Sequence, residues 1–403
     1  MSDLAIMQDV DQDEDAVAGD AGEGFIALSD PDITLAEIEA VDQVMRSPRL
    51  SSGPVVEEFE QAFAAYVGRK YAVAVPSGTI GLLIALKACG IGAGQEVIAS
   101  SYSFREAPHA ISIAGATPVF ADIDYWAGTL APQKVEARIT ANTRAIVASN
   151  NNGHPAQWTE LRALATKHGL RLIEDSTEAI GSVYKGKIVG GFGDCSVFDF
   201  SQPGSLVCGE GGMIVTDDDE LASLIRRLRS HRFEERASVV LGAYPPLQAS
   251  MSDIAAALGL AQLRRIELLL ARRKRVERWY YQYVQSFEGI KDPYVAPEVD
   301  QVCWFLYVVH LGTRFSRSTR DSIIDDLHTE KIGACAYSQP LHLQRAYFDL
   351  GYRRRDLFVT EKVAERAVAL PLHAHLTEDQ IAFIVGTMKD ASINLGAGAA
   401  IYL

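Results

Sequence analysis

Short apolar runs rich in β-branched residues alternate with segments of helical periodicity between residues 25 and 229. This alternation is typical of a sheet of parallel strands that are joined by covering helices. The pattern therefore predicts an α/β fold with a mostly parallel central sheet. The runs that we expect to form strands are residues 71–75, 96–99, 117–120, 145–148, 170–173, 195–198 and 212–215.

The second half of the chain shows longer helical patterns and fewer strand-like runs. Residues 249–285 form one helical pattern rich in arginine, which is typical of a solvated face or of the flank of a dimer interface. We therefore expect a large α/β domain at 25–265 and a smaller C-terminal α+β domain at 266–403. The patterns on which the smaller domain rests are residues 302–311, 319–331 and 378–391.

The composition limits the class of protein. The chain has 403 residues, of which 48% are apolar and 22% charged, and these values argue against collagen-like, coiled-coil and wholly disordered proteins. The formal charge is −14, but residues 1–24 hold eight acidic residues and no Lys or Arg, so about −6 remains for the rest. We expect residues 1–24 to be a disordered acidic tail. Without a basic face, nucleic acid is not an expected partner.

Signals for membranes, secretion and metals do not stand out. No segment approaches the roughly 18 consecutive apolar residues of a membrane-spanning helix, and the N-terminus is acidic where a signal peptide would be basic. We therefore predict a cytoplasmic protein without membrane contact. The five cysteines are scattered without a CxxC pair, so we expect buried thiols and neither a metal site nor a disulfide framework.

A turn of small polar residues separates the first expected strand from a helical pattern at residues 78–89. This turn contains Ser77, Gly78 and Thr79. In a parallel sheet the strand ends hold the ligand, and the exposed N–H groups of a helix start favour an anion such as phosphate. Ser and Thr are also ordinary helix caps. An anion site and simple capping therefore both remain possible.

A series of short motifs follows in order along residues 26–391. They include SSGP at 51–54, SGT at 77–79, SYSF at 101–104, IED at 173–175, YKG at 184–186, GEGG at 209–212, LRSH at 228–231 and PLH at 340–342. Their order resembles that of the DegT/StrS family of nucleotide-sugar aminotransferases, which are fold type I enzymes that use pyridoxal phosphate (PLP). The resemblance implies a fold type I aminotransferase-like fold, a small-molecule substrate, and a homodimer with sites at the subunit interface.

The lysine motif of this family is altered. Family members form an aldimine between PLP and a lysine in a motif similar to FSFxxxK, shortly before GEGG. The corresponding stretch reads FDFSQPG at residues 198–204, which puts Gly204 at the lysine position, and no lysine occurs between Lys187 and Lys274. A Schiff base needs a primary amine. We therefore expect that the protein does not transaminate.

The residues expected near the cofactor phosphate have also changed. Asp199 takes the place of a family serine that helps to bind this phosphate, and two like charges about 4 Å apart repel by roughly 4 kcal/mol at an effective dielectric constant near 20. The family stretch similar to NxRM reads QASM at residues 248–251 and has lost its arginine. Tight binding of PLP is therefore not expected, and our first prediction is that no cofactor is used.

Other family positions are changed less, or replaced by residues of similar shape. The motif similar to EDxAQ reads EDSTE at residues 174–178. Asp175 is kept where the family pairs an acid with the pyridine nitrogen, although a capping or loop acid is the alternative, and Glu178 replaces a glutamine near the ring hydroxyl. Phe104, whose family counterpart stacks on the cofactor ring, is equally consistent with an ordinary core aromatic. The stretch NNNG at 150–153 lacks the histidine of the family's HLYG.

We interpret these changes as those of a biosynthetic enzyme that has kept the pocket and left PLP behind. Neighbouring carboxyl groups push their pKa values apart, which provides one acid and one base. We expect Glu178 first, and Asp199 and Asp175 with it, to act on a polar, sugar-like intermediate, as in a lyase or isomerase. The pocket at the former cofactor site is expected to include Ser77, Gly78, Thr79, Phe104, Ser201, Gly204, Gln248 and Ser250.

Two alternatives remain. The protein could bind PLP or pyridoxamine phosphate (PMP) without a covalent link, as in the sugar dehydrases that resemble this family and carry His at the lysine position, although Gly204 supplies no replacement base. It could also be a non-catalytic partner subunit that completes the site of an active paralogue.

Overall fold

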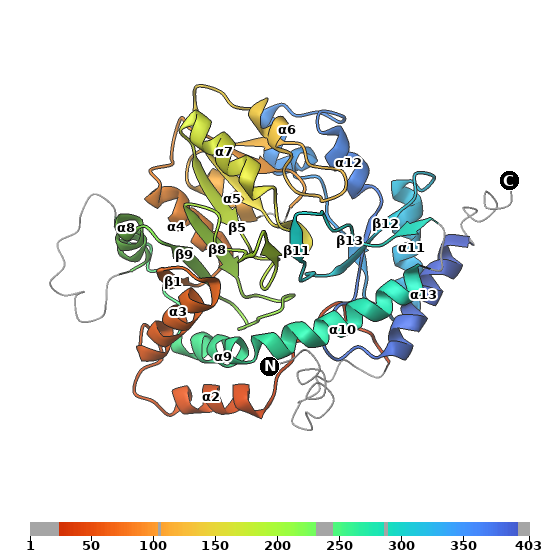
Figure 1. Ribbon diagram of the computed structural model, residues 1–403, viewed down its shortest axis with the longest axis horizontal. Coiled ribbons are helices and arrows are strands. Elements are labelled where there is room, and N and C mark those ends of the chain that lie inside the picture. The colour runs from red at the N-terminus through yellow and green to blue at the C-terminus, as the bar shows by residue number, and fades with distance from the viewer. Residues whose placement is uncertain (1–23, 104–105, 231–244, 286–288, 394–403) are drawn as a thin grey trace.

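A seven-stranded sheet forms the centre of the computed structural model, which describes residues 24–103, 106–230, 245–285 and 289–393 (Figure 1). Its order is β1-β9-β8-β5-β4-β2-β3. β9 runs antiparallel to both neighbours and the other neighbouring strands are parallel, which confirms the mixed α/β fold with a mainly parallel sheet. The strands are β1 (Tyr71–Val75), β2 (Glu96–Ser100), β3 (Thr117–Ala121), β4 (Thr143–Ser149), β5 (Arg171–Asp175), β8 (Cys195–Asp199) and β9 (Gly212–Thr216).

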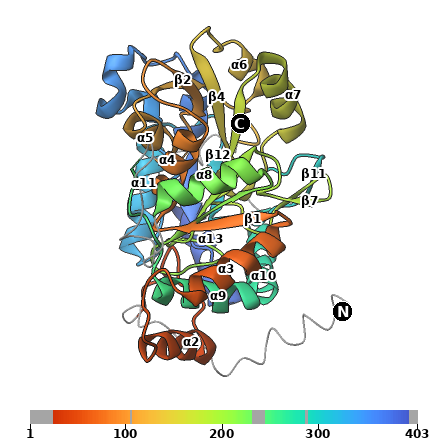
Figure 2. The same ribbon diagram turned by 90° about the vertical axis from the view of Figure 1, so that its left-hand side faces the viewer.

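Helices cover both faces of this sheet. Alternate residues of β1 mark the two faces, because Val73 packs in the core under α4 and α8 whereas Ala72 packs in the core under α3 and α9. Figure 2 shows β1 between α8 and α3. One face carries α4 (Gly78–Ala88), α5 (Glu106–Ile113) and α8 (Asp219–Arg229), and the other α3 (Pro54–Val67), α7 (Trp158–His168) and α9 (Asp253–Arg264); α2 (Leu35–Met45) packs on α9, and α6 (Pro132–Glu136) on α7.

The start of α4 lies close to the end of β8 because small residues permit a close approach. Ser77 caps the helix by accepting a hydrogen bond from the backbone N–H of Ile80 at 3.3 Å. A Cβ at Gly81 would lie only 2.9 Å from a side-chain carbon of Val197 in β8. The small residues of this segment therefore set the distance between the helix and the sheet.

A second sheet organises the C-terminal part, in the order β10-β12-β14-β13. The chain segment at Ile26 joins this part, since Ile26 forms a bridge with Ile332. The elements are β10 (Ile290–Lys291), β12 (Tyr307–Leu311), β13 (Cys335–Ala336), β14 (Ala367–Leu370), α11 (Arg317–Thr329), α12 (Phe358–Ala364), α13 (Glu378–Ser392) and the short helices η3 (Leu341–Leu343) and η4 (Arg345–Leu350). A small third sheet contains β6 (Val183–Tyr184), β7 (Lys187–Ile188) and β11 (Val299–Gln301).

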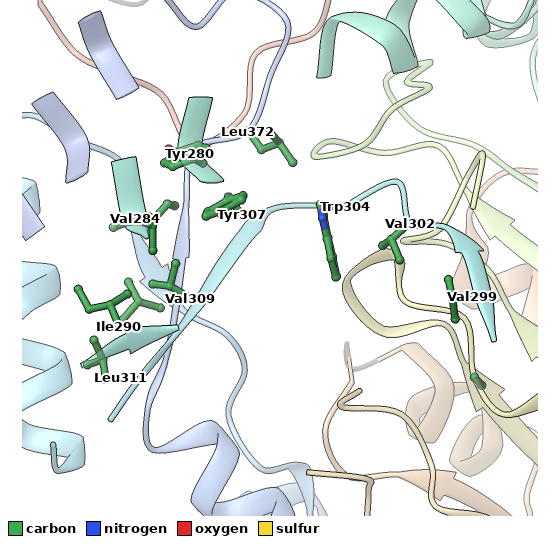
Figure 3. Packing of buried hydrophobic residues seen from close by; sticks show 14 of the residues in the cluster. Tyr280, Val284, Ile290, Val299, Val302, Trp304, Tyr307, Val309, Leu311 and Leu372 are labelled. Atoms are coloured by element: carbon green, nitrogen blue, oxygen red, sulfur yellow. The ribbon is translucent and has the colours of Figure 1, made fainter. Parts of the chain in front are cut away.

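The long α10 (Ile266–Val284) runs from the large sheet to the smaller one (Figure 1). Tyr280 of α10 stacks on Tyr307 of β12 with ring centroids 4.1 Å apart and planes 9° apart (Figure 3). This stacked pair lies in a cluster of buried apolar residues that also includes residues of the large sheet. The two sheets are therefore held together by a shared core.

The pattern at 249–285 differs from the prediction of one helix with a solvated basic face. The chain breaks between α9 and α10 at Arg265, which has φ −107°. Arg272 is buried and its guanidinium contacts Asp32 at 2.6 Å. Arg273 is buried and donates to the backbone carbonyls of Leu372, Trp304 and Phe305. The solvated-face interpretation was thus wrong for Arg272 and Arg273, because Arg272 holds α10 to the N-terminal segment and Arg273 holds it to the C-terminal part of the chain.

The structure leaves some predictions open. Residues 1–23 of the expected acidic tail lie outside the described residues. The expected domain boundary at 265 stays a prediction. In the described part of the chain, no helix combines the length and the apolar character needed to cross a lipid bilayer.

Candidate active site

Two of the predicted acids end neighbouring strands of the large sheet. Asp175 is the last residue of β5 and Asp199 the last residue of β8. In the ladders of β5, Asp175 faces Ser149 of β4 on one side and Val197 of β8 on the other. Because parallel strands end at the same edge, both carboxyl groups lie at the edge where an open α/β sheet holds its ligands.

Asp199 lies directly against the first turn of α4. Its Oδ2 accepts a hydrogen bond from the N–H of Gly78 at 2.6 Å. Its Oδ1 accepts from the N–H of Ser201 at 2.7 Å and also contacts the Ser201 hydroxyl. The positive end of the α4 dipole favours a negative group at this position. An internal carboxylate thus occupies the helix start that the sequence marked as a possible anion site.

Asp175 is buried among neutral donors. Its Oδ2 accepts from the Ser149 hydroxyl at 3.0 Å and its Oδ1 from the N–H of Thr177 at 3.2 Å. Burial raises the pKa of Asp175, and the nearby charge of Asp199 adds to this increase. The hydrogen bonds oppose the shift but do not reverse it.

Glu178 has two oxygens in different surroundings. The carboxyl group is buried, with 8% of the residue exposed. Oε2 accepts a hydrogen bond from the hydroxyl of Tyr337 at 2.5 Å and another from the N–H of Asn152. Oε1 is buried and has no hydrogen-bond partner among the described residues. One oxygen is therefore anchored, and the other is free to carry the proton of the neutral acid.

Burial raises the pKa of Glu178 to about 8, and the charges of Asp175 and Glu106 contribute to the increase. The hydrogen bonds from Tyr337 and Asn152 act in the opposite direction, because they stabilise the ionised form. A pKa near neutrality suits a group that has to release a proton and take it back. Such a value is typical of functional carboxyl groups, although structural networks also produce shifts.

Asn152 and Tyr337 were not among the predicted site residues. Asn152 lies in the short helix η1 (Asn151–Gly153) with φ 51°, and its side-chain oxygen also accepts from the N–H of Leu306 at 3.0 Å. The only sequence signal is the run of three asparagines, which the family resemblance explains as a lost motif. No signal marked Tyr337, because it reaches Glu178 from the other sheet.

The other predicted pocket residues do not all meet at one point. Ser77 and Thr79 lie with Gly78 at the start of α4, and Ser201 contacts Asp199. Gly204 lines a separate cavity of about 20 Å³ beside Asp32, Gln262 and Arg273.

The predicted residues at 248–251 lie elsewhere. Gln248 is exposed, and the Ser250 hydroxyl lies 2.6 Å from that of Ser230. Ser250 lines a cavity of about 420 Å³ between α3 and α8. Phe104 lies outside the described residues.

A second chain of polar groups resembles a catalytic triad but is enclosed. The Ser101 hydroxyl lies 2.6 Å from Nδ1 of His342, whose Nε2 lies 3.3 Å from Glu361. Ser101 and His342 are both completely buried. The backbone N–H of His342 also donates to the Ser101 hydroxyl at 3.0 Å. These bonds tie η3 to the end of β2, so we assign them a structural role.

The residues at this edge do not fit PLP as the family resemblance describes it. No lysine lies between residues 187 and 274, so the loop after β8 offers no amine for an aldimine. The N–H of Gly78, which a phosphate at the start of α4 would need, already donates to Asp199. Neither the covalent link nor the expected phosphate contact is available from these residues.

Comparison with known proteins identifies the relatives of the chain. It is 36% identical over 377 residues to the spore coat polysaccharide biosynthesis protein SpsC of Bacillus subtilis, with 91% of this chain and 97% of that protein covered. It is 36% identical over 373 residues to the GDP-perosamine synthase of Caulobacter vibrioides, with 91% and 98% covered.

Solved structures of sugar aminotransferases are also similar to this chain. The PMP form of the putative sugar aminotransferase Spr1654 from Streptococcus pneumoniae superimposes with a TM-score of 0.87 at 27% identity, with 93% of this chain and all of that chain covered. Helicobacter pylori PseC, an aminotransferase involved in pseudoaminic acid biosynthesis, gives a TM-score of 0.84 at 26% identity, with 91% and 99% covered. A model of the DegT/DnrJ/EryC1/StrS aminotransferase family matches residues 31–389. The chain therefore belongs to the DegT/DnrJ/EryC1/StrS aminotransferase family and has its fold type I architecture.

Proposed function

We propose that this family member is a biosynthetic enzyme that moves a proton on a polar, sugar-like substrate through Glu178, without an aldimine and without transamination. The observation that carries the proposal is the state of Glu178, a buried carboxyl group with one anchored oxygen and one unpartnered oxygen. The names of the relatives, which include a GDP-perosamine synthase and a putative sugar aminotransferase, support a sugar-like substrate. A lyase or isomerase reaction is consistent with this chemistry.

Glu178 can serve as both acid and base in the same turnover. With the anchored oxygen held by Tyr337 and Asn152, the proton of the neutral acid resides on Oε1. Donation of this proton leaves a carboxylate that the same two donors stabilise. Asp175 opposes a second negative charge nearby, which favours return of the proton to Glu178. The two acids therefore differ in role: Glu178 exchanges the proton, and the charge of Asp175 raises the pKa of Glu178.

Non-covalent use of PLP or PMP is the second candidate. Asp175 is kept and buried at the end of β5, where the family resemblance implies a partner for the pyridine nitrogen. A relative of known structure was solved in its PMP form. This candidate requires that the cofactor phosphate be held by groups other than the start of α4.

Exchange of substrate hydrogen with solvent tests the proton-transfer proposal without knowledge of the product. The purified protein is incubated in D₂O with nucleotide-linked keto-sugars, and deuterium in the recovered sugars is measured by mass spectrometry. We expect incorporation by the native protein and a loss of about 10²-fold or more in Glu178→Gln. The exposed Glu39→Gln serves as the matched control and should retain the native rate. Full exchange by folded Glu178→Gln would reject the role of this residue.

We also propose that the protein is a homodimer, with a heteromeric pairing to an active paralogue as the alternative. The support is the exposed stretch at Leu247 and Gln248, next to the cavity at Ser250. The apolar residues Leu260 and Leu263 of α9 are used inside the chain, so they lend no support to an interface. Sedimentation of the full chain at micromolar concentration should give a dimer mass, and a monomer would contradict the proposal.

A further inference from the structure

The start of α4 is filled by a group of the protein itself. We propose that Asp199 is a built-in replacement for a phosphate group, so that the native protein refuses phosphate at this position and accepts only neutral or cationic ligand groups beside it. The inference deepens the proposed function, on which it rests for the location of the site, by naming the class of ligand group that the site takes.

The hydrogen bonds of Asp199 use donors that a phosphate at this position could otherwise accept from. The carboxylate takes the N–H of Gly78 at 2.6 Å and the N–H of Ser201 at 2.7 Å, together with the Ser201 hydroxyl. The Ser77 hydroxyl is engaged in capping Ile80. An incoming anion would have to displace Asp199 from these donors before it could bind.

The available space agrees with this occupation. A Cβ at Gly78 would lie 2.7 Å from the Cβ of Asp199 and 2.9 Å from its Oδ2. A Cβ at Gly212 would lie 2.9 Å from the carbonyl carbon of Ser77 and 3.0 Å from the nitrogen of Gly78. The Asp199 side chain and the β9 backbone thus both lie close to the first turn of α4.

The charge around the site points to the same ligand class. Among the ion pairs of the described residues, none involves Asp175, Glu178 or Asp199. An ionised Asp199 without a cationic partner repels an anionic ligand and attracts an ammonium group, whereas Glu178 keeps its proton near neutral pH and adds no charge. A hydroxyl or an amine of the substrate is therefore the group that fits beside Asp199.

Phosphate binding to Asp199 variants tests this inference directly. Inorganic phosphate and PMP are titrated by calorimetry into the native full-length protein, Asp199→Ser and the nearly isosteric Asp199→Asn. We expect no detectable phosphate binding by the native protein at millimolar concentrations, and binding tighter by at least about tenfold in Asp199→Ser. Asp199→Asn keeps the side-chain shape and removes the charge, so it should give an intermediate gain and remains informative if the serine variant fails to fold.

Asp218→Ser is the matched control, because Asp218 also accepts hydrogen bonds at a helix start, from Glu220 and Leu221 of α8. It should bind phosphate no better than the native protein. Phosphate or PMP binding by the native protein as tight as that of Asp199→Ser would overturn the inference, and so would a folded Asp199→Ser that gains none. These outcomes do not depend on proton exchange by Glu178, so the inference and the proposed function can fail separately.

Discussion

Two groups of buried acids in this protein differ in their partners. Asp32 and Glu37, near the start of the described chain, both contact Arg265, which lies between α9 and α10, and Asp32 also contacts Arg272 of α10. Burial alone would raise the pKa of Asp32, but the hydrogen bond and charge of Arg272 outweigh it and lower the pKa. Glu178 is buried beside hydroxyl and N–H donors and another acid, and its pKa is raised.

The difference teaches how the partner of a buried acid determines whether its pKa is lowered or raised. A buried carboxylate with a cation stays ionised and holds elements together, as Asp32 holds α10 to the N-terminal segment. A buried carboxyl group with neutral donors keeps its proton up to neutral pH and can give it away. Buried acids of this protein therefore titrate in two different pH ranges, and the partner decides which.

Breaking the ion pair between Arg272 and Asp32 should have the largest effect on stability. We expect Arg272→Met to lower the free energy of unfolding by about 3 kcal/mol, because among the described residues it leaves buried Asp32 with the longer contact to Arg265 as its one ion pair. Urea denaturation measures the change. Arg264→Met, which removes an exposed ion pair with Glu58, is the control and should cost less than about 1 kcal/mol. Equal losses in both variants would contradict the distinction.

Glu178, which has no cationic partner among the described residues, should control how stability depends on pH between about 5 and 8. The pKa of Glu178 is about 8 in the folded chain against 4.5 for the free side chain, so the folded state binds more protons between these values. Stability should therefore fall as the pH rises from about 5 to 8, by up to about 1.4 kcal/mol per pH unit. Glu178→Gln should flatten this slope, whereas Glu39→Gln should leave it unchanged.

At acidic pH the stability depends on Asp32, which is paired with arginines, and here it falls as the pH decreases. The pKa of Asp32 is lowered below 3.8, so the stability that it contributes is present at neutral pH and is lost as the pH falls through its folded value. Chemical denaturation between pH 3 and 9 would measure both sides. A slope between pH 5 and 8 that survives in Glu178→Gln would show that another group titrates there.

A smaller change in the pH dependence is expected when the hydrogen bond from Tyr337 to Glu178 is removed. Its hydroxyl stabilises the ionised form of Glu178, so Tyr337→Phe should raise the pKa of this carboxyl group and move the alkaline end of the stability slope to higher pH. Tyr102→Phe is the control, because the Tyr102 hydroxyl donates to the backbone carbonyl of Tyr337 at 2.8 Å and not to the carboxyl group. An unchanged dependence of stability on pH in Tyr337→Phe would show that Tyr337 does not affect the pKa of Glu178.

The sequence predicts the large sheet well because its strands are buried on both faces and appear as continuous apolar runs. Arg272 and Arg273 show the limit of this reasoning. A basic stretch at helical spacing is usually solvated, and only the folded chain brings Asp32 and the carbonyl of Leu372 to these arginines. Local periodicity carries no information about such distant partners.

The site was predictable only in part. Family-like motifs pointed to Asp175, Glu178 and Asp199, and two of these acids end neighbouring strands. The hydroxyl of Tyr337 reaches Glu178 across 159 positions of sequence, which no local pattern reveals. The hydrogen bond from Gly78 to Asp199 was also unexpected. An aspartate at this position could either repel a ligand or accept hydrogen bonds at the helix start, and the sequence alone does not distinguish the two roles.

The hydrogen bond from Gly78 to Asp199 means that a redesign of this site needs more than one substitution. A lysine placed at position 204 alone would supply an amine, while the helix start remained closed by the carboxylate. Its Cβ would also lie 3.3 Å from the carbonyl oxygens of Ser201 and Leu206, so the loop would have to shift by a few tenths of an ångström. Asp199 therefore has to be replaced together with Gly204, because the amine alone leaves the start of α4 occupied by the carboxylate.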